Sequence, residues 1–197
     1  MQDYELVNRI KQGDRALFGQ LAEKYYDEIF RYCYYQTGNE HSAYDCTQET
    51  FCHLLRFLDN YTERNHFKSY LLQIALNVCR DYYRKCSRQN LPLDTLEHTD
   101  YETIALAENP FPSSGAASQP SPEKQVETKL LIQSALQKLP DVQREVIILY
   151  YYHGYKQREI ARITDVPLST VKTRLRAGTE KLQEIFQQAG LFSSMEF

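Results

Sequence analysis

The feature that most constrains the fold is a break in the apolar pattern near the middle of the chain. Residues 91–121 contain the runs NPFPSSG and QPS and have no sustained helical or strand repeat, which predicts a flexible linker. On both sides apolar residues recur at helical spacing, and no run alternates as a strand would. We therefore predict an all-α protein with helical domains at 1–90 and 122–190, joined by that linker and followed by a tail, 191–197.

The expected helix boundaries follow from capping and breaking residues. Asp3 and Asp14 are predicted to cap helices that end near Gly13 and Gly38. Ser121-Pro122 is predicted to begin a helix that ends before Pro140. The remaining helices are expected at about 40–58, 67–88, 141–153, 156–163 and 169–188.

The net charge of −3 conceals a segregation of charge along the chain. Residues 1–90 are balanced, residues 91–127 carry −6, and residues 128–197 carry +3. An acidic bridge therefore joins a neutral domain to a basic one, a pattern that a nucleic-acid-binding protein could use.

Location and cofactors are constrained by what the sequence lacks. No apolar run is long enough to span a membrane, and no signal core follows the N-terminus, so we expect a cytoplasmic protein. The five cysteines are an odd number without C-x-x-C spacing. Zinc binding by cysteines and histidines is the weaker interpretation and buried reduced thiols the stronger, so no metal and no cofactor is expected.

Residues 157–176 have the spacing of a helix-turn-helix. Ile160 and Ile163 would pack the first helix, Asp165 stands where the turn needs a left-handed residue, and Ser169 can cap the second helix. At 100° per residue, one stripe of the second helix carries small polar and charged side chains: Ser169, Lys172, Thr173, Arg176 and Glu180. Such a face suits the DNA major groove, although a packing role or a merely solvated stripe is the alternative.

The first domain carries two further candidate surfaces. Asp45, Gln48 and Glu49 form a polar, acidic patch on the helix predicted at 40–58, whose buried side is expected to contain Ala43, Cys46, Phe51, Leu54 and Leu55. Taken alone, such a patch is more often a solvated face than a docking site.

The helix predicted at 67–88 is expected to bury Phe67, Leu71, Ile74, Ala75, Val78 and Tyr82. Beside that arc runs a stripe of Asn77, Arg80, Arg84 and Arg88, and a polar loop of residues 61–66 precedes the helix. Aromatic and amide groups beside a cationic face can hold an unstacked base and a single-stranded backbone. With 16 tyrosines in the chain, most of these rings are expected to serve packing.

Taken together, these motifs resemble bacterial RNA polymerase sigma factors, most closely the small extracytoplasmic-function (ECF) group of the sigma-70 family. The resemblance rests on D-x-x-Q-E-x-F from Asp45, F-x-x-Y-L-x-x-I-A-x-N from Phe67, Leu139-Pro140, E-I-A from Glu159 and V-K-x-R-L from Val171. It covers residues 1–90 as the promoter-melting domain (region 2) and 122–190 as the upstream-element domain (region 4).

The resemblance implies a role for each candidate residue. Docking on the clamp helices of the largest subunit of core RNA polymerase would involve Asp45, Gln48 and Glu49. The flap of the polymerase is a second implied contact. Capture of a flipped −10 base would use Arg64, Asn65 and His66, and −10 duplex or phosphate contacts would come from Asn77, Arg80, Arg84 and Lys85. The −35 element would be read by Ser169, Thr170, Lys172, Thr173, Arg174 and Arg176. The acidic linker would thread the polymerase's RNA path.

The implied protein is a transcription initiation factor, not an enzyme, with promoter DNA and an anti-sigma factor as further partners and no small-molecule substrate. A free-standing DNA-binding regulator and a helical adaptor that binds only protein are the alternatives.

Several residues depart from the family pattern. Ser42 and Tyr44 stand where an acidic pair is frequent, and Tyr70 replaces a tryptophan. Gln73 and Ile74 stand where housekeeping sigma factors carry paired tryptophans, which implies weaker strand opening.

Overall fold

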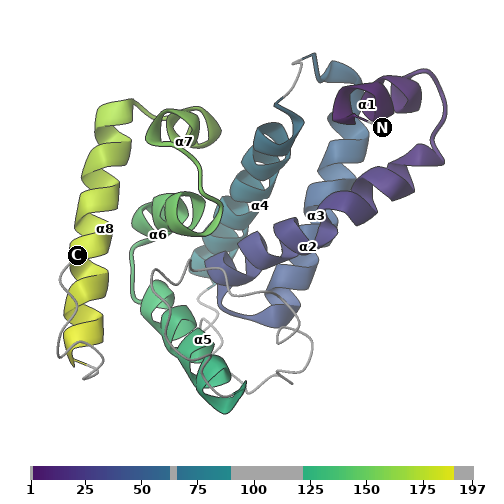
Figure 1. Cartoon of the computed structure of the whole chain (residues 1–197). Coiled ribbons are helices and arrows are strands. Elements are labelled where there is room, and N and C mark those ends of the chain that lie inside the picture. The colour runs from purple at the N-terminus through teal and green to yellow at the C-terminus, as the bar shows by residue number, and fades with distance from the viewer. Residues whose placement is uncertain (1, 63–65, 90–121, 189–197) are drawn as a thin grey trace. The chain divides into compact units, whose positions relative to one another are not determined.

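The computed structural model describes residues 2–62, 66–89 and 122–188, and every regular element in these ranges is a helix (Figure 1). This confirms the predicted all-α class. The chain divides into two compact units, residues 1–96 and 97–197. The predicted linker, 91–121, and the predicted tail, 191–197, lie outside the described residues. In the described ranges, no helix combines the length and the apolar character that crossing a membrane requires.

The first unit is built on three helices that pack against one another, α2, α3 and α4, with the short α1 lying against α2. A single 3-10 turn, η1, follows α3 and contacts α1. The bounds are α1 Asp3–Lys11, α2 Leu17–Thr37, α3 Glu40–Phe57, η1 Leu58–Asn60 and α4 Phe67–Gln89.

The core of this unit forms where the apolar stripes of the three long helices meet. Leu21 on α2, Leu54 on α3 and Leu71 on α4 are all 0% exposed, as the helical spacing of apolar residues requires. On α4 the predicted arc is confirmed for Phe67, Leu71, Ala75 and Val78, whereas Ile74 and Tyr82 are only half-buried. Leu72, which was not in the predicted arc, is fully buried. Removing these side chains from water is the main stabilising contribution to such a bundle.

Both helix caps predicted in the first unit are wrong. Asp3 is the first residue of α1, whose N-cap is Gln2, and its carboxylate accepts hydrogen bonds from Lys24 and Tyr25 at 2.5 Å each. Asp14 lies three residues before α2 begins and forms an ion pair with Arg9 at 2.7 Å. Both carboxylates bind other side chains instead of free helix N–H groups.

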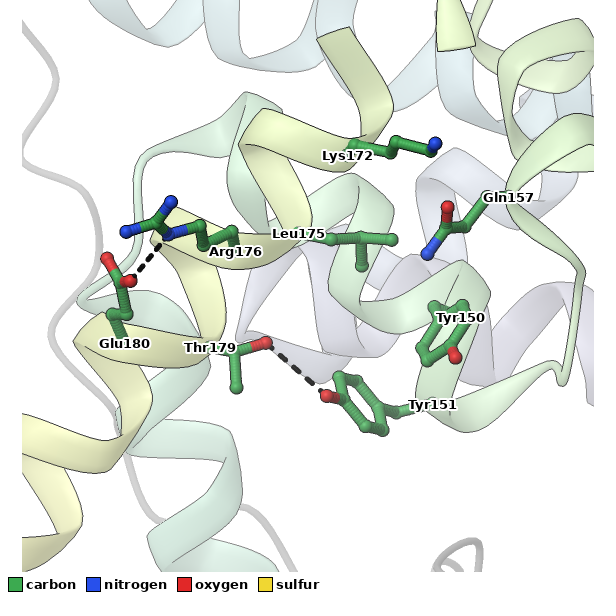
Figure 2. A pocket seen from close by; sticks show the side chains of 8 residues that line it. All are labelled: Tyr150, Tyr151, Gln157, Lys172, Leu175, Arg176, Thr179 and Glu180. Atoms are coloured by element: carbon green, nitrogen blue, oxygen red, sulfur yellow. Dashed lines mark hydrogen bonds and ion pairs between the residues drawn. The ribbon is translucent and has the colours of Figure 1, made fainter. Parts of the chain in front are cut away.

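The second unit is centred on the long C-terminal helix α8, which packs against α5, α6 and α7. A π-helical turn, η2, continues α6, and the Tyr151 hydroxyl on η2 lies 3.4 Å from that of Thr179 on α8 (Figure 2). Ser169 is not the cap of α8, because the helix already begins at Leu168. The bounds are α5 Pro122–Gln137, α6 Asp141–Ile147, η2 Ile148–Tyr152, α7 Gln157–Thr164 and α8 Leu168–Gln188.

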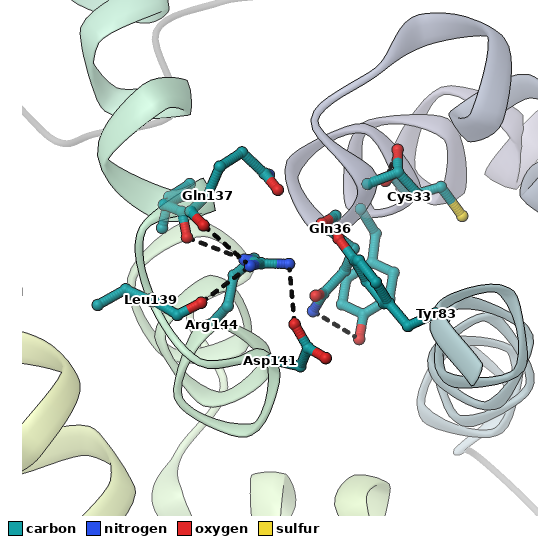
Figure 3. Close-up of polar contacts among 10 residues, drawn as sticks. Cys33, Gln36, Tyr83, Gln137, Leu139, Asp141 and Arg144 are labelled. Carbon is teal, nitrogen blue, oxygen red and sulfur yellow. Dashed lines mark hydrogen bonds and ion pairs between the residues drawn. The ribbon is translucent and has the colours of Figure 1, made fainter. Parts of the chain in front are cut away.

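Arg144 on α6 closes the C-terminal end of α5. Its guanidinium donates to the carbonyl oxygens of Leu136 at 2.9 Å, Leu139 at 2.8 Å and Gln137 at 3.3 Å (Figure 3). The last carbonyls of a helix lack partners within the helix, so one side chain here satisfies several of them. Asp141 also forms an ion pair with this guanidinium, at 3.4 Å.

In the first unit, Figure 3 also shows the Tyr83 hydroxyl of α4 donating to the backbone carbonyl of Gln36 on α2.

Helices α6 and α8 approach one another closely at Gly178. A β-carbon placed on this residue would lie 3.0 Å from Cγ1 of Ile147 and 3.4 Å from Cβ of Gln143. The absence of a side chain at residue 178 is therefore what lets α6 seat against α8.

A leucine at this position should force the two helices apart. We expect Gly178→Leu to lower the free energy of unfolding of the second unit by about 2 kcal/mol or more, as overpacking of a tight contact does. Urea unfolding followed by circular dichroism measures the effect. The matched control is Gly19→Leu on α2, where an added β-carbon meets nothing within 4 Å and leucine favours the helix. Equal stability of the two variants would contradict the close approach.

Candidate nucleic-acid interface

The turn between α7 and α8 has the geometry that the helix-turn-helix spacing predicts. Asp165 adopts a left-handed conformation, with φ 54° and ψ 47°, and its backbone N–H bonds to the carbonyl oxygen of Ala161. Aspartate tolerates this conformation better than most residues with a side chain. The expectation that Asp165 occupies the left-handed position is confirmed.

One face of α8 is free of packing and carries the predicted stripe. Its five members are all exposed: Ser169, Lys172, Thr173, Arg176 and Glu180. The opposite face is buried, with Val171 at 0% and Leu175 at 7% exposure. The second unit therefore presents two cations and two hydroxyl groups on one side of a regular helix.

Two residues of the predicted −35 set lie off this face. Thr170 and Arg174 are half-buried, and Nη1 of Arg174 is buried without a hydrogen-bond partner in the described part of the chain. Helical geometry alone indicates this separation, because residues two apart differ by about 200° around the axis. Arg174 and Arg176 therefore point to different sides of α8.

The exposed Arg176 is engaged by an acid on its own helix. Its Nε lies 2.9 Å from Oε1 of Glu180, one turn further along α8 (Figure 2). Hydrogen bonding and charge attraction from Glu180 raise the pKa of Arg176, so the guanidinium is a permanent cation. Because exposed ion pairs are weak, a phosphate or a base edge can take the place of Glu180.

A shallow hollow of about 410 Å³ lies alongside this face and was not anticipated from the sequence. Its walls come from η2, the start of α7 and the middle of α8 (Figure 2). The lining residues are Tyr150, Tyr151, Gln157, Lys172, Leu175, Arg176, Thr179 and Glu180. The tyrosine run 150–152 was the available signal, but a regular helix over 141–153 gave no reason to expect a hollow there.

In the first unit, α4 presents a polar face opposite its buried stripe. Asn77, Arg84 and Lys85 are exposed and Arg80 is half-buried. Arg84 is paired with Asp81 on the same helix at 2.7 Å. The structure thus brings the four predicted −10 residues of α4 to the solvent-facing half of one helix.

The polar loop before α4 is anchored on both sides. Arg64 and Asn65 lie outside the described residues, and His66, directly before α4, is exposed. Nζ of Lys11 donates to the carbonyl oxygens of Asp59, at 2.9 Å, and Tyr61.

Aromatic packing and an ion pair extend this anchoring into α4. The Tyr61 ring lies 4.8 Å from that of Tyr70 and 5.6 Å from that of Phe67. Nζ of Lys68, in the first turn of α4, lies 2.7 Å from a carboxylate oxygen of Glu28 on α2. Both ends of a loop proposed to hold a base are therefore attached to the helical core.

The acidic patch lies on the exposed side of α3. Asp45, Gln48 and Glu49 are all exposed, and Glu49 bonds to His53 at 2.9 Å. The predicted buried side is confirmed for Ala43, Cys46, Phe51 and Leu54. The prediction that Leu55 is buried is wrong, because this residue is 50% exposed and lies on the outer side of α3. The patch therefore has apolar as well as charged neighbours.

The prediction of buried reduced thiols is confirmed for three of the five cysteines. Cys33, Cys46 and Cys79 are buried free thiols, and their mutual hydrogen bonds raise the pKa of Cys79, which keeps that thiol neutral. Cys52 is exposed and Cys86 half-buried. In the ranges that the structure covers, no group of three or more His, Cys, Asp or Glu is arranged to hold a metal ion.

Comparison with known proteins identifies the family. Residues 21–89 match the family model described as "Sigma-70 region 2", and residues 129–182 match "Sigma-70, region 4". The chain is 32% identical to the ECF RNA polymerase sigma factor SigW of Bacillus subtilis over 183 residues, which is 90% of this chain and 93% of that protein. It is 31% identical to the ECF sigma factor BldN of Streptomyces coelicolor, covering 86% of this chain and 60% of that protein.

Solved structures show the same fold. CnrH in complex with the cytosolic domain of CnrY matches with a TM-score of 0.64 and 22% identity, over 94% of this chain and 97% of that one. RpoE of Bartonella quintana in complex with the anti-sigma factor NepR matches with a TM-score of 0.63 and 22% identity, over 86% and 96%.

The fold and the two matched regions define a sigma-70-type transcription initiation factor rather than an enzyme. Within that class, the chain belongs to the ECF RNA polymerase sigma factors. Its partners are those of the family, core RNA polymerase and promoter DNA.

The ion pair between Arg176 and Glu180 leads to a testable expectation. If the exposed face of α8 contacts DNA, Glu180→Gln should free the guanidinium and remove a negative charge from that face, so promoter binding by the reconstituted holoenzyme should strengthen by roughly threefold or more at low salt. A filter-binding titration measures the change. Glu184→Gln is the matched control, because Glu184 pairs with Lys181 at 2.9 Å further along the same helix. Unchanged or weaker binding by Glu180→Gln would show that Arg176 does not approach DNA.

Proposed function

We propose that this sigma factor reads two promoter elements at once, the −10 element with its first unit and the −35 element with its second. The observation that supports this most directly is common to both units. In each, a long helix is buried on one face and carries cationic and polar residues on the other, α4 with Asn77 and Arg84 and α8 with Lys172 and Arg176. Such faces suit the phosphates and base edges of duplex DNA.

Core polymerase is proposed to hold the two units at the separation of the two elements. The patch of Asp45, Gln48 and Glu49 on α3 is the proposed contact with the clamp helices of the largest subunit, and the second unit is proposed to bind the flap. Linking two weak contacts in this way raises the effective concentration of the second once the first has formed. Neither unit then needs to bind DNA tightly by itself.

Strand opening is assigned to the first unit. Arg64, Asn65 and His66 are proposed to capture a flipped −10 base, while Asn77, Arg80, Arg84 and Lys85 bind the adjacent duplex or its phosphates. Unpairing a base costs a few kcal/mol, which capture in the loop would offset. The anchoring of that loop by Lys11 and Lys68 supports the assignment, because a held loop loses less entropy on binding.

The −35 element is assigned to α8. Ser169, Lys172, Thr173 and Arg176 share its exposed face, so they are proposed to lie in the major groove, with arginine or lysine bonding guanine edges. Thr170 and Arg174 remain proposed contacts at the flank of this face. For Arg174 this requires the guanidinium to turn outward from its half-buried position.

The domain boundaries and cellular setting form part of the same proposal. Region 2 is assigned to residues 1–90 and region 4 to 122–190, joined by an acidic linker that lies in the polymerase's RNA path. We place the protein in the cytoplasm, where the polymerase acts. An anti-sigma factor is proposed as a regulator, in line with the solved structure of RpoE in complex with the anti-sigma factor NepR.

Replacing Arg176 should damage promoter selection without affecting assembly. We expect Arg176→Ala to lower transcription from the cognate promoter by about tenfold, the loss of one good contact to a base, while binding to core polymerase is unchanged. Run-off transcription and a core-binding titration measure the two quantities. Lys138→Ala removes the same charge from an exposed residue that is not on α8 and should leave both unchanged. Wild-type promoter preference in Arg176→Ala would rule out the proposed reading face.

Reversing the charge of the acidic patch should impair binding to core polymerase, which Arg176→Ala is expected to leave unchanged. Asp45→Arg combined with Glu49→Arg should weaken association with core polymerase by tenfold or more, because charge reversal removes the complementarity proposed between this patch and the clamp helices. The matched control is Glu23→Arg with Asp27→Arg, two exposed acids at the same spacing on α2. Capture of core at native strength by the Asp45 and Glu49 variant would disprove the docking assignment.

A further inference from the structure

The π-helical turn η2 places two exposed tyrosines beside α8. Tyr150 and Tyr151 are 38% and 39% exposed, whereas Ile148 and Leu149, directly before them, are 1% and 0% exposed. The two rings meet edge to face with centroids 5.0 Å apart, so each restricts the other. Single π-helical turns are rare and occur frequently at functional sites.

Both tyrosine side chains line the hollow next to the cationic side of α8. Both residues line it together with Lys172 and Arg176, which are members of the proposed reading face (Figure 2). The Tyr151 hydroxyl lies 3.4 Å from that of Thr179. If Thr179 donates in this pair, the Tyr151 O–H is left to donate to a ligand.

The remaining lining residues indicate the charge of the ligand. Gln157, the first residue of α7, adds an amide, and Leu175 contributes the apolar floor. The single carboxylate among the lining residues is that of Glu180, and Arg176 already pairs with it. The hollow is open and shallow, and its rim is made of cations and hydrogen-bond donors, which suits an extended anionic chain better than an enclosed small molecule.

We propose that Tyr150 and Tyr151 bind the sugar-phosphate backbone of the same DNA duplex whose bases α8 reads, by donating hydrogen bonds to phosphate oxygens. This inference rests on the proposed −35 function of the second unit. It makes the two tyrosines positioning residues: they set the depth and register of α8 in the groove, and they read no base themselves. The hollow is continuous with the reading face through Lys172 and Arg176, so one strand can touch both.

A neutral hydroxyl leaves a characteristic signature in the salt dependence of binding. Lysine and arginine contacts with phosphates release counterions. Losing one such contact therefore makes the negative slope of log affinity against log salt shallower by about one. A tyrosine hydroxyl is neutral, so its contact with a phosphate releases no counterion. Losing that hydroxyl removes a hydrogen bond and nothing else. Tyr150→Phe and Tyr151→Phe should therefore weaken binding at every salt concentration while leaving the slope unchanged.

The experiment measures promoter binding by reconstituted holoenzyme over a range of potassium chloride concentrations. We expect each Phe variant to bind about threefold to tenfold more weakly, equally on promoters with different −35 sequences. Lys172→Ala should bind more weakly with a lower slope. The matched control is Tyr152→Phe, the neighbouring tyrosine of η2 that does not line the hollow.

A second arm locates the contacted phosphate. Methylphosphonate groups, which are uncharged, replace single phosphates of the −35 DNA one at a time. At one or two positions the wild-type protein should lose affinity, and at those positions the Phe variants should lose nothing further. A loss that is the same at every position, or unchanged affinity of the Phe variants, would overturn the proposal.

Two outcomes separate this inference from the proposed function. If Lys172→Ala weakens promoter binding and the Phe variants do not, the tyrosine contact is wrong while the −35 assignment stands. If none of these variants affects binding, the −35 assignment itself fails. A defect of the Phe variants in binding core polymerase, measured without DNA, would show that the hollow faces protein and would also overturn the proposal.

Discussion

The rotation of α8 about its own axis is the constraint on which the rest of the second unit depends. A helix turns by 100° per residue, so a rotation by the equivalent of one or two residues would turn the reading face toward the packed side. Two local features hold this rotation. Gly178 lets α6 approach α8 at van der Waals distance, and the left-handed Asp165 sets the angle at which the chain leaves α7. With both in place, Val171 and Leu175 face inward and Lys172 and Arg176 face outward.

In the first unit, too, the buried face of a helix determines which residues face outward. The buried stripe of α4, which includes Leu71 and Leu72, leaves Asn77 and Arg84 on the outer side. Lys11 and the ring of Tyr61 fix the turn from which the loop before α4 departs. Each unit therefore has its own core and its own outward face. In this account the polymerase, rather than contact between the units, brings the two faces onto one duplex.

Much of this could be predicted from the sequence, because an amphipathic helix reveals its buried side through spacing alone. The positions of the helices and the exposed stripe of α8 follow from 3.6-residue periodicity, and the left-handed turn follows from the helix-turn-helix spacing. The caps did not follow, because Asp3 and Asp14 find partners in Lys24 and Arg9 that are distant or invisible to a local rule. Leu55 has the composition of a core residue but lies on the outer side of α3.

The tyrosines of η2 were missed for a different reason. A π-helical turn holds more residues per turn than an α-helix, so the phase of every residue after it shifts. A regular helix drawn through 141–153 therefore places Tyr150 and Tyr151 incorrectly. Arg174 shows the converse: its spacing from Arg176 already indicated a different side of the helix, although the −35 set implied by the family resemblance includes both.

The most direct test of the account is run-off transcription with purified core polymerase, this protein and a pool of random promoter sequences. The account predicts that selected templates share two conserved blocks at a fixed spacing, and that lengthening the spacer by half a helical turn abolishes their use. RNA synthesis that starts at the same sites with and without the protein, or selected templates with a single block, would contradict the claim that polymerase holds two DNA-reading units on one promoter.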